Sequence, residues 1–155
     1  MLDAVASGWS ATGIFLMQSG LPFSVTSGVD NARSGTGGQL ADVVADPTLP
    51  GDRSTAEQIN QWLNISAFAP NALGTFGNSG RNAFRGPGYQ SLDLGLHKMF
   101  NAQGRAKVQV RIEAFNLLNN ANFDLPTSSQ SSPNFGKILM AFDPRIMQLA
   151  LRLSF

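Results

Sequence analysis

This 155-residue chain is long enough for one ordinary soluble domain, but only 14% of its residues are charged, well below the roughly 25% usual in such domains. Apolar residues reach 43% without any run of about 18 that could cross a membrane as a helix, and the 16 Gly and 8 Pro indicate a turn-rich, all-β chain. The net charge of +1 gives no basis for nucleic-acid binding, which needs a clustered basic face, and the absence of Cys excludes disulfides, thiolate metal sites and a Cys nucleophile.

The first expected strand region covers residues 9–27. Its first ten residues are rich in β-branched and aromatic side chains, which favour strands, although the alternation is imperfect. Trp9 would suit an interfacial aromatic girdle and would equally suit the core of a soluble sheet. Ser19-Gly20 signals a turn or a bulge, so one bent strand and a hairpin both remain open.

Residues 28–88 form a long loop region with several Gly- and Pro-containing turns and little periodicity. A connection of this length is unusual in a compact soluble domain, whereas large outer-membrane barrels carry long loops on their outer face. The region therefore favours a barrel. Within it we expect a short helix between Thr55 and Leu63 and a further strand at residues 68–76.

Regular alternation returns in two expected strands, residues 89–100 and 106–116, separated by a short turn at Asn101 to Gly104. The first strand places three leucines on one face, and the second has four apolar residues on one face: Val108, Val110, Ile112 and Ala114. Its other face carries a polar row: Lys107, Gln109, Arg111 and Glu113. A helix would scatter such rows around its circumference. We expect the apolar row to face lipid and the polar row to face the lumen of a barrel.

Two more strands are expected at residues 135–142 and 145–155, joined by a tight turn at Asp143-Pro144. The odd positions of the last strand are apolar: Met147, Leu149, Leu151, Leu153 and Phe155. This period of two makes one face of the strand apolar, and about ten residues suffice to cross a bilayer when tilted. We interpret this segment as the closing strand of a barrel.

The predicted fold is therefore all-β: an antiparallel transmembrane β-barrel segment of about six strands with a long loop region, which cannot close alone because a filled barrel needs about eight strands. Met1 to Gly8 lacks the basic and hydrophobic parts of a secretory signal, so we expect the sequence to be the C-terminal piece of a larger chain. The alternative is a soluble or secreted β-sandwich binding module, for example for carbohydrate, in which the leucine rows would pack a core.

The ionisable residues do not favour an enzyme. His97 is the only histidine, which excludes multi-histidine zinc sites. It shares a face with Asp93, and a lumen-facing polar residue is favoured over a catalytic pair. Asp93 and Glu113 could form a carboxylate pair on adjacent strands. Their pairing with Lys107 and Arg111 in a cross-strand charge ladder is the favoured interpretation. We expect no catalytic residue, no metal site and no cofactor.

Short motifs in order along the chain carry a family likeness. They are Gly8-Trp9, Ser19-Gly20-Leu21-Pro22-Phe23, Gly74-Thr75-Phe76-Gly77-Asn78, Arg81-Asn82, Gly86-Pro87-Gly88-Tyr89, Leu92-Asp93-Leu94, the segment Arg111 to Phe123, Phe135-Gly136-Lys137, Pro144-Arg145 and Gln148-Leu149-Ala150-Leu151 with the terminal Phe155. Together they resemble the C-terminal barrel region of TonB-dependent outer-membrane receptors. The likeness is greatest to the Oar-like subgroup with an N-terminal carboxypeptidase-regulatory-like domain, common in Acidobacteria, and it covers nearly the whole chain.

The resemblance implies a bacterial outer-membrane location and a barrel of about 22 antiparallel strands that takes up or exports a bulky solute. An N-terminal plug, the other strands and the contact with TonB would lie outside this sequence. The implied partners are outer-membrane lipid and the barrel-assembly machinery. The terminal strand, with Leu149, Leu151, Leu153 and Phe155, would be the signal that this machinery reads by strand addition. The transported ligand is not indicated.

Overall fold

The computed structural model describes residues 7–101 and 106–155, and the chain divides into two compact units. The first, called the sheet unit below, consists of Met1–Gln18, Tyr89–Asn122 and Asp143–Phe155. The second, called the loop unit, consists of Ser19–Gly88 and Phe123–Phe142. Each unit is described by itself.

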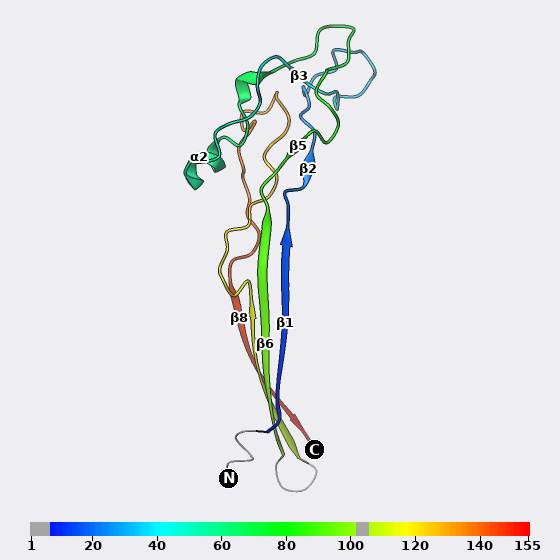
Figure 1. The fold of residues 1–155 in the computed structure, drawn as a ribbon. Coiled ribbons are helices and arrows are strands. Elements are labelled where there is room, and N and C mark those ends of the chain that lie inside the picture. Colours follow the sequence, from blue (N-terminus) through cyan, green and yellow to red (C-terminus); the bar gives the residue numbers. More distant parts are fainter. Residues whose placement is uncertain (1–6, 102–105) are drawn as a thin grey trace. The chain divides into compact units, whose positions relative to one another are not determined.

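The sheet unit contains a four-stranded antiparallel sheet in the order β1-β6-β7-β8 (Figure 1). Its strands are β1 (Trp9–Gln18), β6 (Tyr89–Asn101), β7 (Lys107–Phe115) and β8 (Ile146–Ser154). Among the described residues β1 and β8 are its two edge strands. Neighbouring strands are antiparallel, so β1 and β7 run in one direction and β6 and β8 run in the other. The chain therefore leaves β1 toward β6, and β7 toward β8, at the same end of the sheet.

The register of the sheet aligns side chains of one kind across all four strands. On one face, called the apolar face, the central rows are Trp9–Lys98–Val110–Leu151, Ala11–Leu96–Ile112–Leu149 and Gly13–Leu94–Ala114–Met147. On the opposite face, called the polar face, the central rows are Ser10–His97–Arg111–Ala150 and Thr12–Gly95–Glu113–Gln148. Successive residues of a strand point to opposite faces, so the period of two in each strand becomes two chemically distinct surfaces.

The loop unit is built from short elements. They are β2 (Pro22–Phe23), β3 (Asp42–Val43), α2 (Thr55–Asn60), the 3-10 helix Ile65–Ala67, β4 (Phe68–Ala69) and β5 (Phe84–Arg85). Strand β2 pairs with β5, and β3 pairs with β4, each as an antiparallel two-stranded sheet. The long connection is therefore a folded unit rather than an unstructured loop.

A hydrophobic core holds the loop unit together. Its buried members are Phe23, Val25, Ala41, Leu63, Ala67 and Phe68. The ring of Phe68 contacts those of Phe84 and Phe135 edge-on, with centroids 5.3 Å and 5.6 Å apart. Phe135 belongs to the second segment of the unit, so the core joins residues far apart in the sequence.

The all-β antiparallel fold is confirmed, but of the six expected strands one is much shorter than expected and one is absent. Residues 68–76 contain only the two-residue strand Phe68–Ala69. Residues 135–142 form no strand and contribute only an isolated bridge between Phe123 and Ala141. Gly136 has a φ of 78°, a left-handed conformation that interrupts an extended segment.

The first expected strand region is neither one bent strand nor a hairpin, because its two strands pair with different partners, β6 and β5. Residues 9–27 contain β1, which ends at Gln18, and the separate strand β2. A Cβ on Gly20 would lie 1.8 Å from the carbonyl oxygen of Gly86, so only glycine allows the two chain segments to pass this closely. The expected short helix is confirmed as α2 and ends at Asn60. Most of the expected turn at Asn101 to Gly104 lies outside the described residues.

Candidate functional site

The apolar face of the sheet unit is exposed. Leu149, Leu151 and Leu153 on β8 are 77%, 66% and 64% exposed, and the same face of the other strands exposes further large side chains: Phe15, Met17, Leu94, Leu96 and Ile112. A contiguous apolar surface of this kind marks contact with a partner or a membrane. The terminal Phe155 is fully exposed. The described residues of the sheet unit form one sheet, and none of them builds a second layer over this face as in a β-sandwich.

Lys98 is the only charged side chain in the central rows of the apolar face, and it is only 4% exposed. Its ammonium group donates to the carbonyl oxygen of Ser7 and lies 4.9 Å and 5.3 Å from the ring centroids of Trp9 and Phe100. Cation–π contacts of this kind stabilise a charge near apolar surroundings. The lysine therefore interrupts the apolar row without presenting its charge on that face.

The predicted polar row Lys107, Gln109, Arg111 and Glu113 lies on the polar face of β7. Arg111 Nη2 donates to Glu113 Oε1 at 2.6 Å, and His97 Nε2 lies 3.8 Å from the same oxygen. The ion pair thus runs along β7 between residues two apart. The expected cross-strand ladder is wrong in this respect, because the arginine reaches the carboxylate of its own strand.

Asp93 has a different role from the one expected for it. Its Oδ1 accepts hydrogen bonds from Ser91 Oγ at 2.9 Å and from the backbone N–H of Asn116 at 2.9 Å. The carboxylate therefore ties the end of β7 to β6 instead of pairing with Arg111 or Lys107. Within residues 7–101 and 106–155, no group of three or more His, Cys, Asp or Glu residues is arranged to hold a metal ion.

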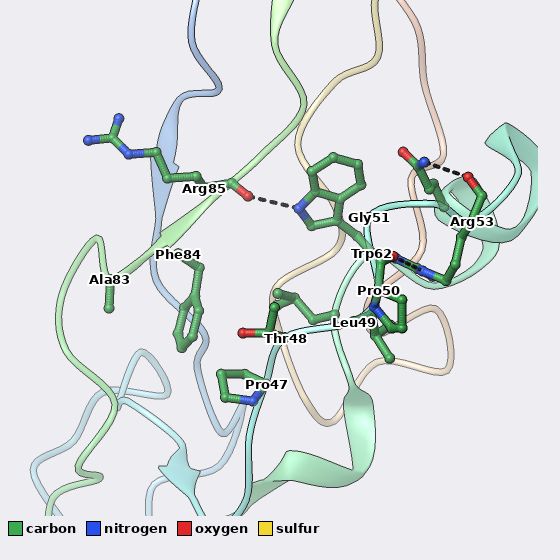
Figure 2. A pocket seen from close by; sticks show the side chains of 12 residues that line it. Pro47, Thr48, Leu49, Pro50, Gly51, Arg53, Trp62, Ala83, Phe84 and Arg85 are labelled. Carbon is green, nitrogen blue, oxygen red and sulfur yellow. Dashed lines mark hydrogen bonds between the residues drawn. The ribbon is translucent and has the colours of Figure 1, made fainter.

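The loop unit contains a cavity of about 500 Å³ that the sequence did not predict (Figure 2). It is lined by Pro47, Thr48, Leu49, Pro50, Gly51, Arg53, Gln58, Trp62, Leu63, Ala83, Phe84 and Arg85. Most of these residues come from one continuous stretch around α2, and the remainder come from β5 and the residue before it. The volume is within the roughly 300–1,000 Å³ typical of ligand pockets.

Hydrogen bonds fix the walls of this cavity. Trp62 Nε1 donates to the carbonyl oxygen of Arg85 at 2.8 Å, and the backbone N–H of Trp62 donates to Gly136 at 2.7 Å. Arg53 donates through Nε to Pro50 and through Nη1 to Gln61, at 3.0 Å and 2.6 Å. Both side chains are thus held by backbone carbonyl groups.

A capping box begins α2 beside the cavity. Ser54 Oγ accepts from the backbone N–H of Glu57, and the Glu57 carboxylate accepts from the backbone N–H of Ser54 at 2.8 Å. Hydrogen bonds from the Ser54 hydroxyl and then from its backbone N–H hold the pKa of Glu57 below its usual value. The reciprocal bonds satisfy two donors that a helix start otherwise leaves unpaired.

Some signals for the cavity were present in the sequence. Pro47 and Pro50 precede Trp62 by 12 to 15 positions in the sequence. The sequence therefore has a large aromatic residue near a turn-rich stretch. The contribution of Ala83, Phe84 and Arg85 had no such signal, because these residues reach the cavity only through the pairing of β5 with β2.

Four antiparallel strands that expose an apolar face and carry polar residues on the other are characteristic of transmembrane β-barrels. The family model described as outer membrane beta barrel domain matches residues 1–148. The chain belongs to this family and is located in the bacterial outer membrane. No curated protein and no solved structure matches it. No helix in the described part of the chain is long and apolar enough to span a membrane.

Proposed function

We propose that this chain supplies the closing strands of a TonB-dependent outer-membrane receptor that takes up or exports a bulky solute. The family supports a barrel, and the motifs from Gly8-Trp9 to the terminal Phe155 resemble the C-terminal region of such receptors. In this proposal the apolar face of the sheet unit contacts outer-membrane lipid. The polar face lines the lumen, and the missing plug and remaining strands belong to the same longer protein.

The observation that carries the proposal is that the loop unit is folded, with a hydrophobic core and a cavity of its own. Its two segments connect β1 to β6 and, within a longer connection, β7 to β8, so both arise from one end of the sheet. A barrel that served only as an anchor would not need a folded unit with its own hydrophobic core and a cavity of about 500 Å³. Loops held by a rigid scaffold commonly carry binding functions.

We assign no catalytic role to the polar face. Lys107 and Gln109 are polar residues suited to a water-filled or plugged lumen, and Arg111 and Glu113 pair with each other. An ion pair of this kind is polar and adds no net charge to the proposed lumen. The whole row then acts as a lining.

Crosslinking in cells tests dependence on TonB. A photoreactive group in the periplasmic domain of TonB should crosslink to the intact receptor in the outer membrane. A matched variant that lacks only the N-terminal TonB-contacting segment should be inserted but should not crosslink. An inserted receptor that never crosslinks to TonB would contradict the proposal and leave the family membership intact.

We further infer that the barrel-assembly machinery recognises β8 through four side chains: Leu149, Leu151, Leu153 and Phe155. Strand β8 is an edge strand among the described residues, and an exposed edge offers backbone hydrogen bonds while alternate side chains add specificity. All four of these side chains are exposed. They are therefore available to a protein that recognises the strand before the barrel closes.

Deletion of Phe155 from the intact protein tests this inference. Outer-membrane insertion, measured by protease protection and heat-modifiable migration, should fall sharply for the deletion. The control variant Ser154→Ala, whose side chain lies on the opposite face of β8, should insert normally. Insertion of the deletion at the level of the control would rule out the assembly signal.

A further inference from the structure

We propose that the cavity of the loop unit binds an anionic solute with a flat apolar group, with Trp62 as the stacking surface and Arg53 as the anion contact. The inference rests on the proposed receptor function and adds the chemical class of the solute. It is carried by the lining of the cavity, the fixed positions of two side chains and the distribution of charge.

The walls of the cavity are mostly apolar. Leu63 is buried, and Phe84 and Trp62 pack against the hydrophobic core of the unit. Pro47, Leu49 and Pro50 line the rest (Figure 2). Ligand pockets are typically apolar clefts with a few polar groups that orient the ligand, and this lining matches that description.

Trp62 is fixed as a flat surface. Its indole N–H and its backbone N–H are both donated to carbonyl oxygens, those of Arg85 and Gly136. The side chain therefore does not need to be ordered when a ligand binds, and less conformational entropy is lost. Aromatic rings favour offset stacking against other flat groups, so the ligand portion beside Trp62 should be planar and apolar.

Among the residues that the structure describes, two arginines are the charged residues of the lining, and no Asp or Glu is part of it. The Arg53 guanidinium is held by the carbonyl groups of Pro50 and Gln61, which are neutral acceptors. Glu57, whose charge interacts with that of Arg53, directs its carboxylate to the backbone and hydroxyl of Ser54. The Glu57 charge offsets part of the Arg53 charge from outside the lining. The lining itself carries positive charge only, and this charge favours an anion.

Arg85 contributes differently. Its carbonyl oxygen accepts from Trp62, while its guanidinium turns away from the Trp62 ring (Figure 2) and donates through Nη1 to Gly20 at 3.2 Å. The two arginines thus have the same charge and line the same cavity, but the guanidinium of Arg85 is directed to Gly20, so we assign the anion contact to Arg53. Arg85 is a matched control for Arg53.

A neutral sugar fits the lining less well. The neutral polar side chains that line the cavity are Thr48 and Gln58, and Gln58 Nε2 is already donated to the carbonyl oxygen of Arg53 at 2.8 Å. A polyhydroxylated ligand would leave several of its hydroxyl groups unpaired against apolar walls. Each buried polar group without a partner is unfavourable, so a single anionic group on an apolar body is the better match.

Binding of three naphthalene probes to the intact protein in detergent tests the proposal. The probes are 2-naphthoate, its neutral amide and the cationic naphthylmethylammonium, with dissociation constants measured by saturation-transfer NMR. We expect naphthoate to bind about tenfold more tightly than the amide, a difference of about 1.4 kcal/mol, and the cation to bind least. Equal affinities for the acid and the amide would overturn the proposal, as would displacement of naphthoate by methyl glucoside.

Four variants sharpen the test. Arg53→Gln should abolish the preference for the acid, Arg53→Lys should retain part of it, and Arg85→Gln should leave it unchanged. Trp62→Leu should weaken binding of acid and amide by the same factor. Slow hydrogen exchange of the residue 62 backbone N–H, which donates to Gly136, checks that each variant is folded. Equal losses in Arg53→Gln and Arg85→Gln would overturn the assignment of Arg53.

The outcomes separate this inference from the proposed function. Probe binding in a receptor that never crosslinks to TonB would contradict TonB dependence and leave the cavity assignment standing. Crosslinking to TonB without the acid-over-amide preference would contradict the cavity assignment alone.

Discussion

The loop unit packs a group of apolar side chains into a buried core, whereas the large apolar side chains of β1 and β8 in the sheet unit lie on the surface. Val25 is fully buried and Phe68 is 5% exposed, while every residue of β1 and β8 is exposed. The same hydrophobic effect explains both arrangements, because it depends only on removal of apolar surface from water. The loop unit buries part of its apolar surface in its own core, and the sheet unit belongs to a chain of the outer membrane beta barrel family, in which the strands contact lipid.

The two units also satisfy their backbone groups differently. In the sheet the four strands pair with one another in long ladders. In the loop unit polar side chains bond to irregular backbone, as when Ser79 Oγ donates to Val25 O and Val43 N donates to Asn78 Oδ1. Buried backbone groups need partners, so the irregular unit depends on specific polar residues where the sheet depends on register.

The largest expected effect is loss of the loop-unit core. Phe68→Ala removes a buried ring that contacts Phe84 and Phe135 and should destabilise the loop unit by about 3–5 kcal/mol. Hydrogen exchange should accelerate across the loop unit and stay slow in β6 and β7. Phe76→Ala is the control, because Phe76 is 74% exposed. Equal acceleration in both variants would contradict the assignment of the core.

A charge on the apolar face should have a somewhat smaller effect on stability. This effect should fall on the sheet unit rather than on the loop unit. Leu149→Arg should destabilise the membrane-inserted protein by about 2–4 kcal/mol, the range for a basic residue near the bilayer midplane. Gln148→Arg is its control, since residue 148 lies on the polar face opposite Glu113. Denaturant unfolding in lipid vesicles measures both. If the two variants were equally stable, the assignment of the faces would be wrong.

Removal of the helix cap should affect only one part of the loop unit. Ser54→Ala deletes the hydroxyl that accepts from the backbone N–H of Glu57 and should destabilise α2 by about 1 kcal/mol. Faster hydrogen exchange confined to residues 55–61 would be the result. Thr55→Ala, one residue later on the exposed side of α2, should show little change. A global effect would indicate that α2 is essential to the core.

The smallest expected effect is a dependence on pH. The pKa of Glu57 is lower in the folded chain because of its bonds to Ser54, so its contribution to stability is complete above the ordinary glutamate pKa of 4.5. It is lost as the pH falls through the lower folded-state pKa. Hydrogen exchange in α2 should accelerate over that acidic range. Glu57→Gln should remove this pH dependence, and an unchanged profile would contradict the role of the carboxylate.

Strand positions were predictable wherever the signal was local. The strands expected at residues 89–100 and 106–116 match β6 and β7 to within about one residue at the ends that the structure describes. The expected strand at residues 135–142 failed, although Ile138, Met140 and Phe142 alternate. Ile138 is buried, and its backbone N–H donates to Ile59 instead of to a neighbouring strand. A contact with a residue far away in sequence overrode the local pattern.

Alternation within β7 and β8 was enough to assign two faces and an all-β barrel class, because side-chain direction in a strand is a local property with a period of two. Tertiary structure alone decided that Asp93 ties β6 to Asn116 and that residues 83–85 join residues 47–63 around one cavity. Each of these outcomes depends on strand register or on segments that meet only after folding, and a pattern read along the chain contains neither.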